Sequence, residues 1–317
     1  MANYVRISLL SLPPLHKEFP GVEKLEAAIG EMEDYICRSV DKVLPDKPDL
    51  ILVPEACDRF DGFSDAENEL YYRMRADRIC NVLCRIAKEN HCYVAYSAIR
   101  SVPEDAEFPF RNSTQLIERS GEIVGAYDKN HLVPMELEKR KIAYGQEAPV
   151  FQLDFGKVCC AICFDLNFDE LLVRYRVQSP DLILFSSFYH GGLRQQQWAY
   201  ACRAHFAGAI AGEQSRILNP FGETIATTTN YQDYITAEIN LDCALVHIDE
   251  NWEKCMAAKR KYGRLLEIHD PGYVGSVLLS YKGENRSVRD IIKEFDILPL
   301  DRYFDRCREH RQAHLVP

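Results

Sequence analysis

One hexapeptide pattern occurs twice in the chain, and it constrains the fold more than any other feature. The runs PDLILV at residues 48–53 and PDLILF at residues 180–185 each place four consecutive apolar residues after a Pro-Asp pair. Four such residues are too few for a helix, and a strand that is apolar at every position must be covered on both faces. The repeat therefore predicts a layered α/β domain in which two equivalent buried strands deliver side chains to one rim of the sheet.

The first 240 residues alternate between helix and strand patterns. Apolar residues recurring every three or four positions predict a helix at residues 22–43. We expect further helices at residues 67–89, 169–178 and 193–206. Short apolar runs predict strands at residues 5–10, 49–54, 92–99, 113–118, 122–126, 149–153, 157–162, 182–185, 207–211, 215–218 and 234–239.

No low-complexity linker interrupts these elements, so we expect one domain over residues 1–242. The remaining residues, 243–317, are more charged. They carry helix-like patterns at 251–266 and 288–295 and a strand-like pattern at 275–281. We expect this C-terminal extension to have no core of its own and to pack on the domain or on a partner subunit.

The composition argues against several classes of partner. The 317 residues carry a formal net charge of -10, whereas nucleic acids and anionic membranes bind cationic surfaces. No apolar run approaches the roughly 20 residues that cross a bilayer. The first twelve residues lack the long apolar region and cleavage site of a secretory signal. We therefore expect a cytoplasmic protein that binds neither nucleic acid nor membrane.

Three short segments each end a buried-type strand in a charged or nucleophilic residue. These are VPEA at residues 53–56, YDKNHL at 127–132 and ICFDLNF at 162–168, which contain Glu55, Lys129 and Cys163. A cysteine between a strand and a following helix faces backbone N–H groups, which favour a thiolate and an oxyanion.

A thiol also needs a base and a cation nearby in order to react well at neutral pH. Glu55 could accept the proton of Cys163, and Lys129 could stabilise a tetrahedral oxyanion. Each residue alone has an ordinary structural explanation, as a solvated strand end, a surface lysine or a core thiol. The functional interpretation depends on the three together.

In their order and spacing these motifs resemble the nitrilase superfamily of carbon–nitrogen hydrolases, over most of residues 4–240. The resemblance implies a four-layer α-β-β-α sandwich that forms homodimers or larger homo-oligomers. It implies that Glu55 is the general base, that Lys129 and the backbone N–H of Phe164 stabilise the oxyanion, and that Cys163 carries a thioester. We expect no metal and no other cofactor.

The family often has a second glutamate that orients the lysine and the substrate. Glu138 matches its spacing best, and Glu136 is the alternative. The sequence departs from the family pattern at Tyr144, at Asp169 and over residues 203–207, which are outside the three motif positions.

The resemblance also bears on the substrate. The pair Phe164-Asp165 after the nucleophile is closer to the amidase and carbamoylase branches than to nitrilases proper. An amide of a small carboxylic acid is thus the first choice, with N-carbamoyl amides and nitriles as alternatives. Tyr189, His190 and Arg194 follow the second copy of the repeat and, like Phe164, are candidate substrate contacts. Arg194 would suit a carboxylate.

Three other interpretations compete. The pair Cys160 and Cys163 is a C-x-x-C, but in a strand their Cα atoms would be about 10 Å apart, beyond the roughly 7 Å that a disulfide spans. A papain-like pair would use His131 or His205 as the base. A third possibility is a homologue that binds a small molecule without turnover. The twelve cysteines are scattered through apolar segments, so we expect most of them to be reduced core thiols.

Overall fold

The computed structural model of the chain describes residues 1–102 and 104–315, which form two compact units. Among the described residues, one unit comprises 5–102 and 104–238, and the other comprises 1–4 together with 239–315. The two units divide between residues 238 and 239.

The larger unit contains two six-stranded sheets. In the first, the strand order is β14 (Tyr234–Asn240), β1 (Tyr4–Leu10), β3 (Leu50–Leu52), β5 (Tyr93–Ser101), β6 (Phe110–Ile117), β7 (Ile123–Asp128). In the second, the order is β13 (Thr224–Thr227), β12 (Arg216–Leu218), β11 (His205–Ile210), β10 (Leu182–Ser187), β9 (Gly156–Ile162), β8 (Val150–Leu153). A separate two-stranded pair consists of β2 (Leu15–His16) and β4 (Phe60–Asp61).

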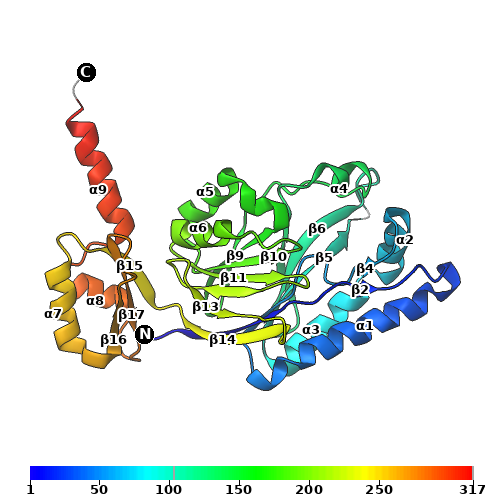
Figure 1. Cartoon of the computed structure of the whole chain (residues 1–317), viewed down its shortest axis with the longest axis horizontal. Helices are drawn as coiled ribbons and strands as arrows, with labels where there is room; N and C mark the ends of the chain where they lie inside the picture. The colour runs from blue at the N-terminus through cyan, green and yellow to red at the C-terminus, as the bar shows by residue number, and fades with distance from the viewer. Residues whose placement is uncertain (103, 316–317) are drawn as a thin grey trace. The chain divides into compact units, whose positions relative to one another are not determined.

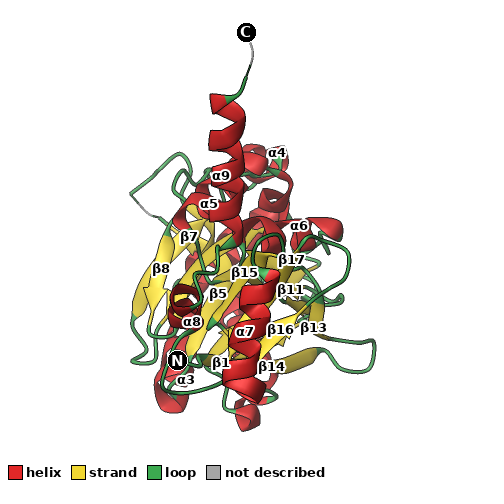
Figure 2. Cartoon of the chain, turned by 90° about the vertical axis from the view of Figure 1, so that its left-hand side faces the viewer, coloured by secondary structure: helices red, strands yellow, loops and turns green. Residues whose placement is uncertain are grey.

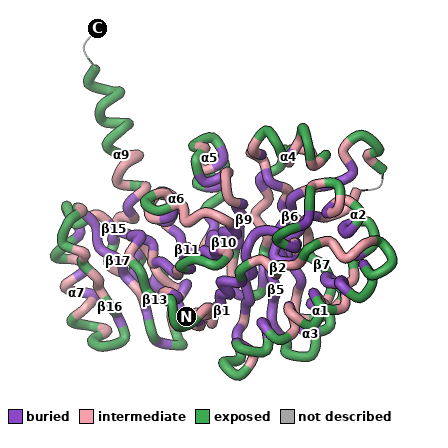
Figure 3. Tube along the Cα trace, turned by 45° about the vertical axis from the view of Figure 1, so that its right-hand side comes forward, coloured by how far each residue is buried: buried purple, intermediate pink, exposed green. Residues whose placement is uncertain are grey.

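Helices cover the outer face of each sheet, and the two sheets face one another (Figure 1). The first sheet is covered by α1 (Leu25–Asp41), α2 (Asp65–Arg75) and α3 (Arg78–Asn90), and the second by α5 (Asp169–Gln178) and α6 (Leu193–Cys202). Buried residues concentrate in the strands of both sheets (Figure 3). The predicted four-layer α-β-β-α sandwich is therefore confirmed.

The repeated hexapeptide forms equivalent central strands. In the first sheet β3 pairs in parallel with β1 and β5, and in the second sheet β10 pairs in parallel with β9 and β11. All residues of both strands are buried, as expected for strands covered on both faces. The hydroxyl of Ser186 donates a hydrogen bond to the carbonyl oxygen of Val53 at 2.9 Å, so the ends of the two repeats meet.

Two predicted helices were too long. The helix expected at 67–89 is divided into α2 and α3, because Ala76 adopts a positive φ of 45° that a helix cannot accommodate. The helix expected at 193–206 ends at Cys202, where Arg203 has a φ of 58°, and β11 begins at His205. Neither break has a Gly or Pro to mark it, and strand β13 was not predicted.

The smaller unit has a three-stranded antiparallel sheet in the order β15 (Cys243–His247), β17 (Ser276–Tyr281), β16 (Leu266–His269). Two helices, α7 (Trp252–Tyr262) and α8 (Val288–Glu294), pack on this sheet, and α9 (Leu300–Ala313) follows (Figure 2).

The prediction that residues 243–317 lack their own core is wrong. A separate cluster of buried side chains lies between the sheet and the helices: Val246, Cys255, Ala258, Leu266, Val277, Leu279, Tyr281, Val288, Ile291, Ile292 and Ile297. The last two residues of the predicted extension, 316 and 317, lie outside the described part of the chain. The expected packing on the domain or a partner stays a prediction.

Candidate active site

Glu55 lies directly beyond β3, and its carboxylate is almost completely buried, with 4% of the residue exposed. Lys129 Nζ and Asn112 Nδ2 donate hydrogen bonds to its Oε1 at 2.9 and 2.8 Å. The backbone N–H of Phe188, just after β10, donates to its Oε2 at 3.3 Å. The carboxylate is thus held at the rim where the two repeated strands end.

Lys129 follows β7, and both its backbone N–H and its backbone carbonyl form hydrogen bonds. Its N–H donates to the carbonyl oxygen of Asn112 at 2.8 Å, and its own carbonyl oxygen accepts from the N–H of Gly145 at 2.8 Å. A Cβ at position 145 would lie 2.0 Å from the carbonyl oxygen of Asp128, so only glycine permits this close approach.

The ammonium group of Lys129 contacts two carboxylates, Glu55 and Glu136, each at 2.9 Å. Burial alone would lower the pKa of Lys129, but the two negative charges outweigh it and raise the pKa above its usual value. The side chain is therefore a fixed cation at neutral pH and cannot act as a base.

The second glutamate beside Lys129 is Glu136, and the expectation that Glu138 orients the lysine does not hold. Glu136 is 4% exposed, whereas Glu138 is exposed to solvent. The reason is local: the short helix α4 (Pro134–Glu138) begins at a proline. This makes Glu136 its third residue, and the Glu136 carboxylate accepts a hydrogen bond from the N–H of Val133 at 2.9 Å while it also contacts Lys129.

Asn112 on β6 is a member of the site that the sequence analysis missed. Its Nδ2 donates to Glu55 Oε1 at 2.8 Å and to Glu136 Oε1 at 2.9 Å, so one amide group bridges both carboxylates. Its Oδ1 is buried and has no hydrogen-bond partner among the described residues. A polar residue in a strand carries no local signal of such partners, because they are distant in the chain.

Cys163 follows the last residue of β9 and opens a 3₁₀ helix (Cys163–Asn167). Its φ of 49° is in the left-handed region, which is strained for a residue with a side chain. The buried carboxylate of Asp165 stabilises this turn by accepting the N–H of Ile162 at 3.0 Å.

Asp165 also joins the cysteine turn to the lysine segment. It accepts hydrogen bonds from the hydroxyl of Tyr127 at 2.6 Å and from the N–H of His131 at 2.8 Å. One buried side chain therefore fixes the relative positions of the segments that carry Cys163 and Lys129.

The environment of Cys163 keeps its thiol protonated at neutral pH. Burial and the nearby Glu55 carboxylate raise its pKa, Lys129 opposes the rise, and the result is a pKa of about 12. The sulfur is therefore not a resting thiolate, and a nucleophilic role requires a base to remove its proton.

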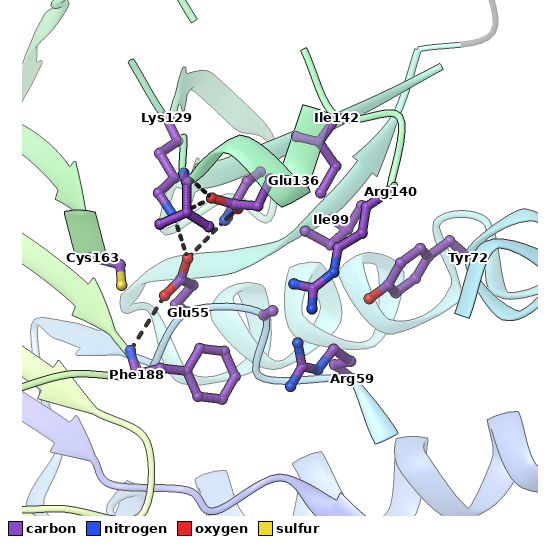
Figure 4. Close-up of a pocket in the computed structure, with 13 residues that line it drawn as sticks. Glu55, Arg59, Tyr72, Ile99, Lys129, Glu136, Arg140, Ile142, Cys163 and Phe188 are labelled. Carbon is purple, nitrogen blue, oxygen red and sulfur yellow. Dashed lines mark hydrogen bonds and ion pairs between the residues drawn. The ribbon is translucent and has the colours of Figure 1, made fainter. Parts of the chain in front are cut away.

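Glu55, Lys129 and Cys163 line one pocket of about 330 Å³ (Figure 4). This volume suits a small molecule. The residues that line it are Glu55, Ala56, Arg59, Tyr72, Ile99, Asn112, Lys129, Val133, Glu136, Arg140, Ile142, Cys163 and Phe188. The three residues that the sequence analysis singled out are thus brought together, although they are far apart in the chain.

The four predicted substrate contacts are placed differently. None of Phe164, Tyr189, His190 and Arg194 is among the described residues that line this pocket. The guanidinium of Arg194 is already bound to the carboxylate of Asp169, at 2.6 Å. The arginines that do line the pocket are Arg59 and Arg140, which come from loops without a recognisable motif and which the sequence analysis missed.

The competing histidine and disulfide interpretations find no support in this geometry. His131 Nδ1 lies 3.0 Å from the carboxylate of Asp165, and its ring stacks on Phe168. His205 is buried, which lowers its pKa to about 4. Neither histidine is among the described residues of the pocket. Cys160 is a fully buried free thiol in β9.

In residues 1–102 and 104–315 no group of three or more His, Cys, Asp or Glu side chains is arranged to hold a metal ion. None of the helices described there is both long enough and apolar enough to cross a membrane.

Sequence comparisons relate the chain to known proteins. The family model described as carbon-nitrogen hydrolase matches residues 12–244. The deaminated glutathione amidase of Escherichia coli O157:H7 is 32% identical over 137 residues, which are 38% of this chain and 52% of that protein. The omega-amidase NIT2 of Xenopus tropicalis is 21% identical over 234 residues, which are 65% of this chain and 82% of that protein.

Solved structures share the fold. Nit3 of Saccharomyces cerevisiae, a member of the nitrilase superfamily, superposes with a TM-score of 0.60 at 15% identity, covering 75% of this chain and 90% of that one. An amidase from Nesterenkonia sp. gives a TM-score of 0.59 at 17% identity over 74% of this chain and 90% of the other. These structures show that the chain shares their fold. The family match over residues 12–244 shows that the chain belongs to the carbon-nitrogen hydrolase family.

Proposed function

We propose that the protein hydrolyses the C–N bond of a small amide through a thioester on Cys163. The observation that carries the proposal is that a thiol, a carboxylate and an ammonium group line one small pocket, with Glu55 Oε1 only 2.9 Å from Lys129 Nζ. Acyl transfer from a protonated nucleophile requires a general base and a fixed cation beside it, and here the carboxylate of Glu55 and the ammonium group of Lys129 take these places.

In the first half of the reaction Glu55 removes the proton of the Cys163 thiol. The sulfur then attacks the amide carbon, and the carbonyl oxygen becomes an oxyanion that Lys129 stabilises. When the tetrahedral intermediate collapses, the C–N bond breaks, and Glu55 returns its proton to the leaving nitrogen. The products of this half are ammonia or an amine and an acyl thioester on Cys163.

In the second half water attacks the thioester while Glu55 accepts one of its protons. The C–S bond breaks, the carboxylic acid is released, and the proton returns to the sulfur of Cys163. Glu136 and Asn112 act as positioning residues, because both hold the Glu55–Lys129 pair in place.

The relatives support an amide rather than a nitrile or an N-carbamoyl compound. The matched proteins include amidases. In a mutant of one Nesterenkonia amidase of the same fold, at a TM-score of 0.59, the acetamide moiety of fluoroacetamide is covalently added at the active-site cysteine. That adduct identifies the cysteine of the relative as a nucleophile, and we propose the same part for Cys163 in this chain.

The test is hydrolysis of a panel of small amides, nitriles and N-carbamoyl compounds, with release of ammonia as the readout. We expect the wild-type protein to hydrolyse at least one amide and the Cys163→Ala variant to hydrolyse none. Cys160→Ala is the matched control, because it removes a thiol of the same strand end that does not line the pocket. Binding of panel members without turnover would support the non-catalytic alternative instead.

Three expectations stay predictions. These are a cytoplasmic location, assembly into homodimers or larger homo-oligomers, and packing of residues 243–315 on the domain or on a partner subunit. The mass of the intact protein in solution, measured by light scattering, tests the second.

A further inference from the structure

The hydroxyl of Ser187 lies beside the sulfur of Cys163. Ser187 ends β10, one residue beyond Ser186, and Ser186 pairs with Ile162 of the parallel strand β9. Cys163 is the residue that follows Ile162, so the two strands end side by side at these positions. Ser187 is fully buried, and its hydroxyl is within hydrogen-bonding reach of the Cys163 sulfur.

The hydroxyl of Ser187 has one proton and two possible acceptors for it. Its oxygen accepts a hydrogen bond from the backbone N–H of Tyr189 at 2.9 Å, which fixes the position of that oxygen. The proton can then point to the carbonyl oxygen of Tyr189, 2.7 Å away, or to the sulfur of Cys163. Rotation about one C–O bond moves the proton between these acceptors, and the serine keeps its proton in both positions.

A thiolate at Cys163 would share its cation with two carboxylates. The ammonium group of Lys129 donates hydrogen bonds to Glu55 and to Glu136, each at 2.9 Å. The hydroxyl of Ser187, in contrast, binds no carboxylate in the described part of the chain. A donor that binds the sulfur alone therefore adds support for the negative charge that Lys129 does not give.

The hydrogen bonds to Glu55 and to Cys163 have opposite effects on the proton transfer between these two residues. Asn112 and the N–H of Phe188 donate to the Glu55 carboxylate, at 2.8 and 3.3 Å, so they stabilise the charge before the thiol gives up its proton. A hydrogen bond from Ser187 to the sulfur stabilises the charge after that transfer. Only an interaction that is stronger after the transfer than before it favours the reaction.

We propose that Ser187 is a catalytic hydrogen-bond donor, whose hydroxyl turns from the Tyr189 carbonyl to the Cys163 sulfur when that sulfur carries negative charge. The inference rests on the proposed function, in which Cys163 is the nucleophile. In the first half of the reaction the charge appears when Glu55 takes the thiol proton. In the second half it appears again when the C–S bond breaks, until the sulfur regains its proton from Glu55.

The first experiment measures the thiol without any turnover. The rate at which iodoacetamide alkylates Cys163 is followed at about pH 8 by peptide mass spectrometry, in the wild type and in Ser187→Ala. Loss of a hydrogen bond to the thiolate raises the pKa of Cys163 and so lowers the thiolate fraction, although the remaining thiolate becomes more nucleophilic. We expect alkylation to slow about threefold to tenfold. An unchanged rate would overturn the proposal.

Ser186→Ala is the matched control. Ser186 is buried as well, but side chains alternate along a strand, and its hydroxyl donates to the carbonyl oxygen of Val53 in the other sheet at 2.9 Å. We expect alkylation of Cys163 in this variant to match that of the wild type. Equal slowing in both variants would mean that a disturbed strand end, and not the Ser187 hydroxyl, affects the thiol, and would overturn the proposal.

Two further variants separate the hydroxyl from the space that it fills. Ser187→Thr keeps the hydroxyl and can form the same turn with the backbone two residues later, so alkylation of Cys163 should stay near the wild-type rate. Ser187→Cys keeps the shape but has a weaker donor, and it replaces Ser187→Ala if circular dichroism shows that Ser187→Ala is not folded. Slow alkylation in a folded Ser187→Thr, or a wild-type rate at Cys163 in a folded Ser187→Cys, would contradict the proposal.

A turnover measurement separates this inference from the proposed function. For an amide that the wild type hydrolyses, we expect Ser187→Ala to lower kcat about tenfold. KM should stay that of the wild type, because Ser187 is not among the described residues that line the pocket. Slower alkylation in Ser187→Ala supports the hydrogen bond to sulfur even if no amide is hydrolysed. Full hydrolysis together with wild-type alkylation in Ser187→Ala would overturn the inference and leave the hydrolase intact.

Discussion

Glu55 and Asp58 lie three residues apart in the chain, and each belongs to a different cluster of buried charges. In the first, Glu55 and Glu136 pair with Lys129. In the second, Asp58 pairs with Arg75, which also donates to the hydroxyl of Tyr96 at 2.7 Å and to the carbonyl oxygen of Ile99 at 2.5 Å. All of the charged side chains in both clusters are at most 5% exposed.

The two clusters differ in whether their charged side chains line a cavity. Glu55, Lys129 and Glu136 line the pocket beside a thiol, whereas neither Asp58 nor Arg75 is among the described residues that line it. The second cluster joins the loop after β3 to α2 and β5, because Arg75 and the hydroxyl of Tyr96 both donate to Oδ2 of Asp58. Burial of a charge is therefore no mark of chemistry by itself. A charge becomes available for catalysis when a substrate can reach it.

The largest expected effect is on turnover, and it comes from the first cluster, whose residues Glu55, Lys129 and Glu136 line the pocket. Replacement of Glu55 by Gln keeps the shape of the side chain but removes the base. We expect amide hydrolysis to fall by about 10²- to 10⁴-fold, while the circular dichroism spectrum stays that of the wild type. Turnover within a few fold of the wild type would place the base elsewhere.

A substitution in the second cluster, which contains Asp58 and Arg75, should lower the stability of the fold instead. Asp58→Asn leaves the Arg75 charge buried without its partner, and we expect a loss of about 3–5 kcal/mol in the free energy of unfolding. Urea denaturation measures this loss. If the folded fraction of Asp58→Asn also loses most of its turnover per molecule, the separation of a structural from a functional cluster is wrong.

A smaller effect distinguishes the two glutamates of α4. Glu136→Gln removes one of the carboxylates that hold Lys129, and we expect kcat/KM to fall about tenfold to a hundredfold. Glu138→Gln, two residues later and exposed, is the matched control and should leave the kinetics unchanged. Equal effects of the two substitutions would contradict the assignment of Glu136.

The smallest expected effect is on the ionisation of Cys163. Because the Glu55 carboxylate helps to raise the pKa of this thiol to about 12, Glu55→Gln should lower that pKa. Alkylation by iodoacetamide requires the thiolate, so its pH profile at Cys163, followed by peptide mass spectrometry, should shift to lower pH in the variant. A profile that stays in place or shifts to higher pH would show that the charge of Glu55 does not raise the pKa of the Cys163 thiol.

Much of the fold could be predicted from the sequence because it depends on local pattern. Continuous apolar runs identified β3 and β10 as covered strands, and the three- and four-residue spacing of apolar residues located α1. The break at Ala76 could not be predicted, since it depends on a left-handed backbone conformation with no Gly or Pro nearby. The core of residues 243–315 was missed because its apolar positions are spaced among charged ones.

The site was predictable only where a motif carries its residues. Glu55, Lys129 and Cys163 each end a strand in a recognisable segment, and all three line the pocket. Glu136 had a usable signal, since Pro134 marks the start of a helix whose third residue folds back on the backbone. Asn112 had none, because its contacts arise from tertiary packing.

The most direct test of the account is the mass of Cys163 during turnover. The protein is mixed with a hydrolysed amide, quenched with acid within the reaction time and digested, and the peptides are weighed. We predict an adduct with the mass of the acyl group on the peptide that carries Cys163, which disappears as substrate is consumed. Sustained hydrolysis with no adduct on Cys163, and with full activity in Cys163→Ala, would contradict the account.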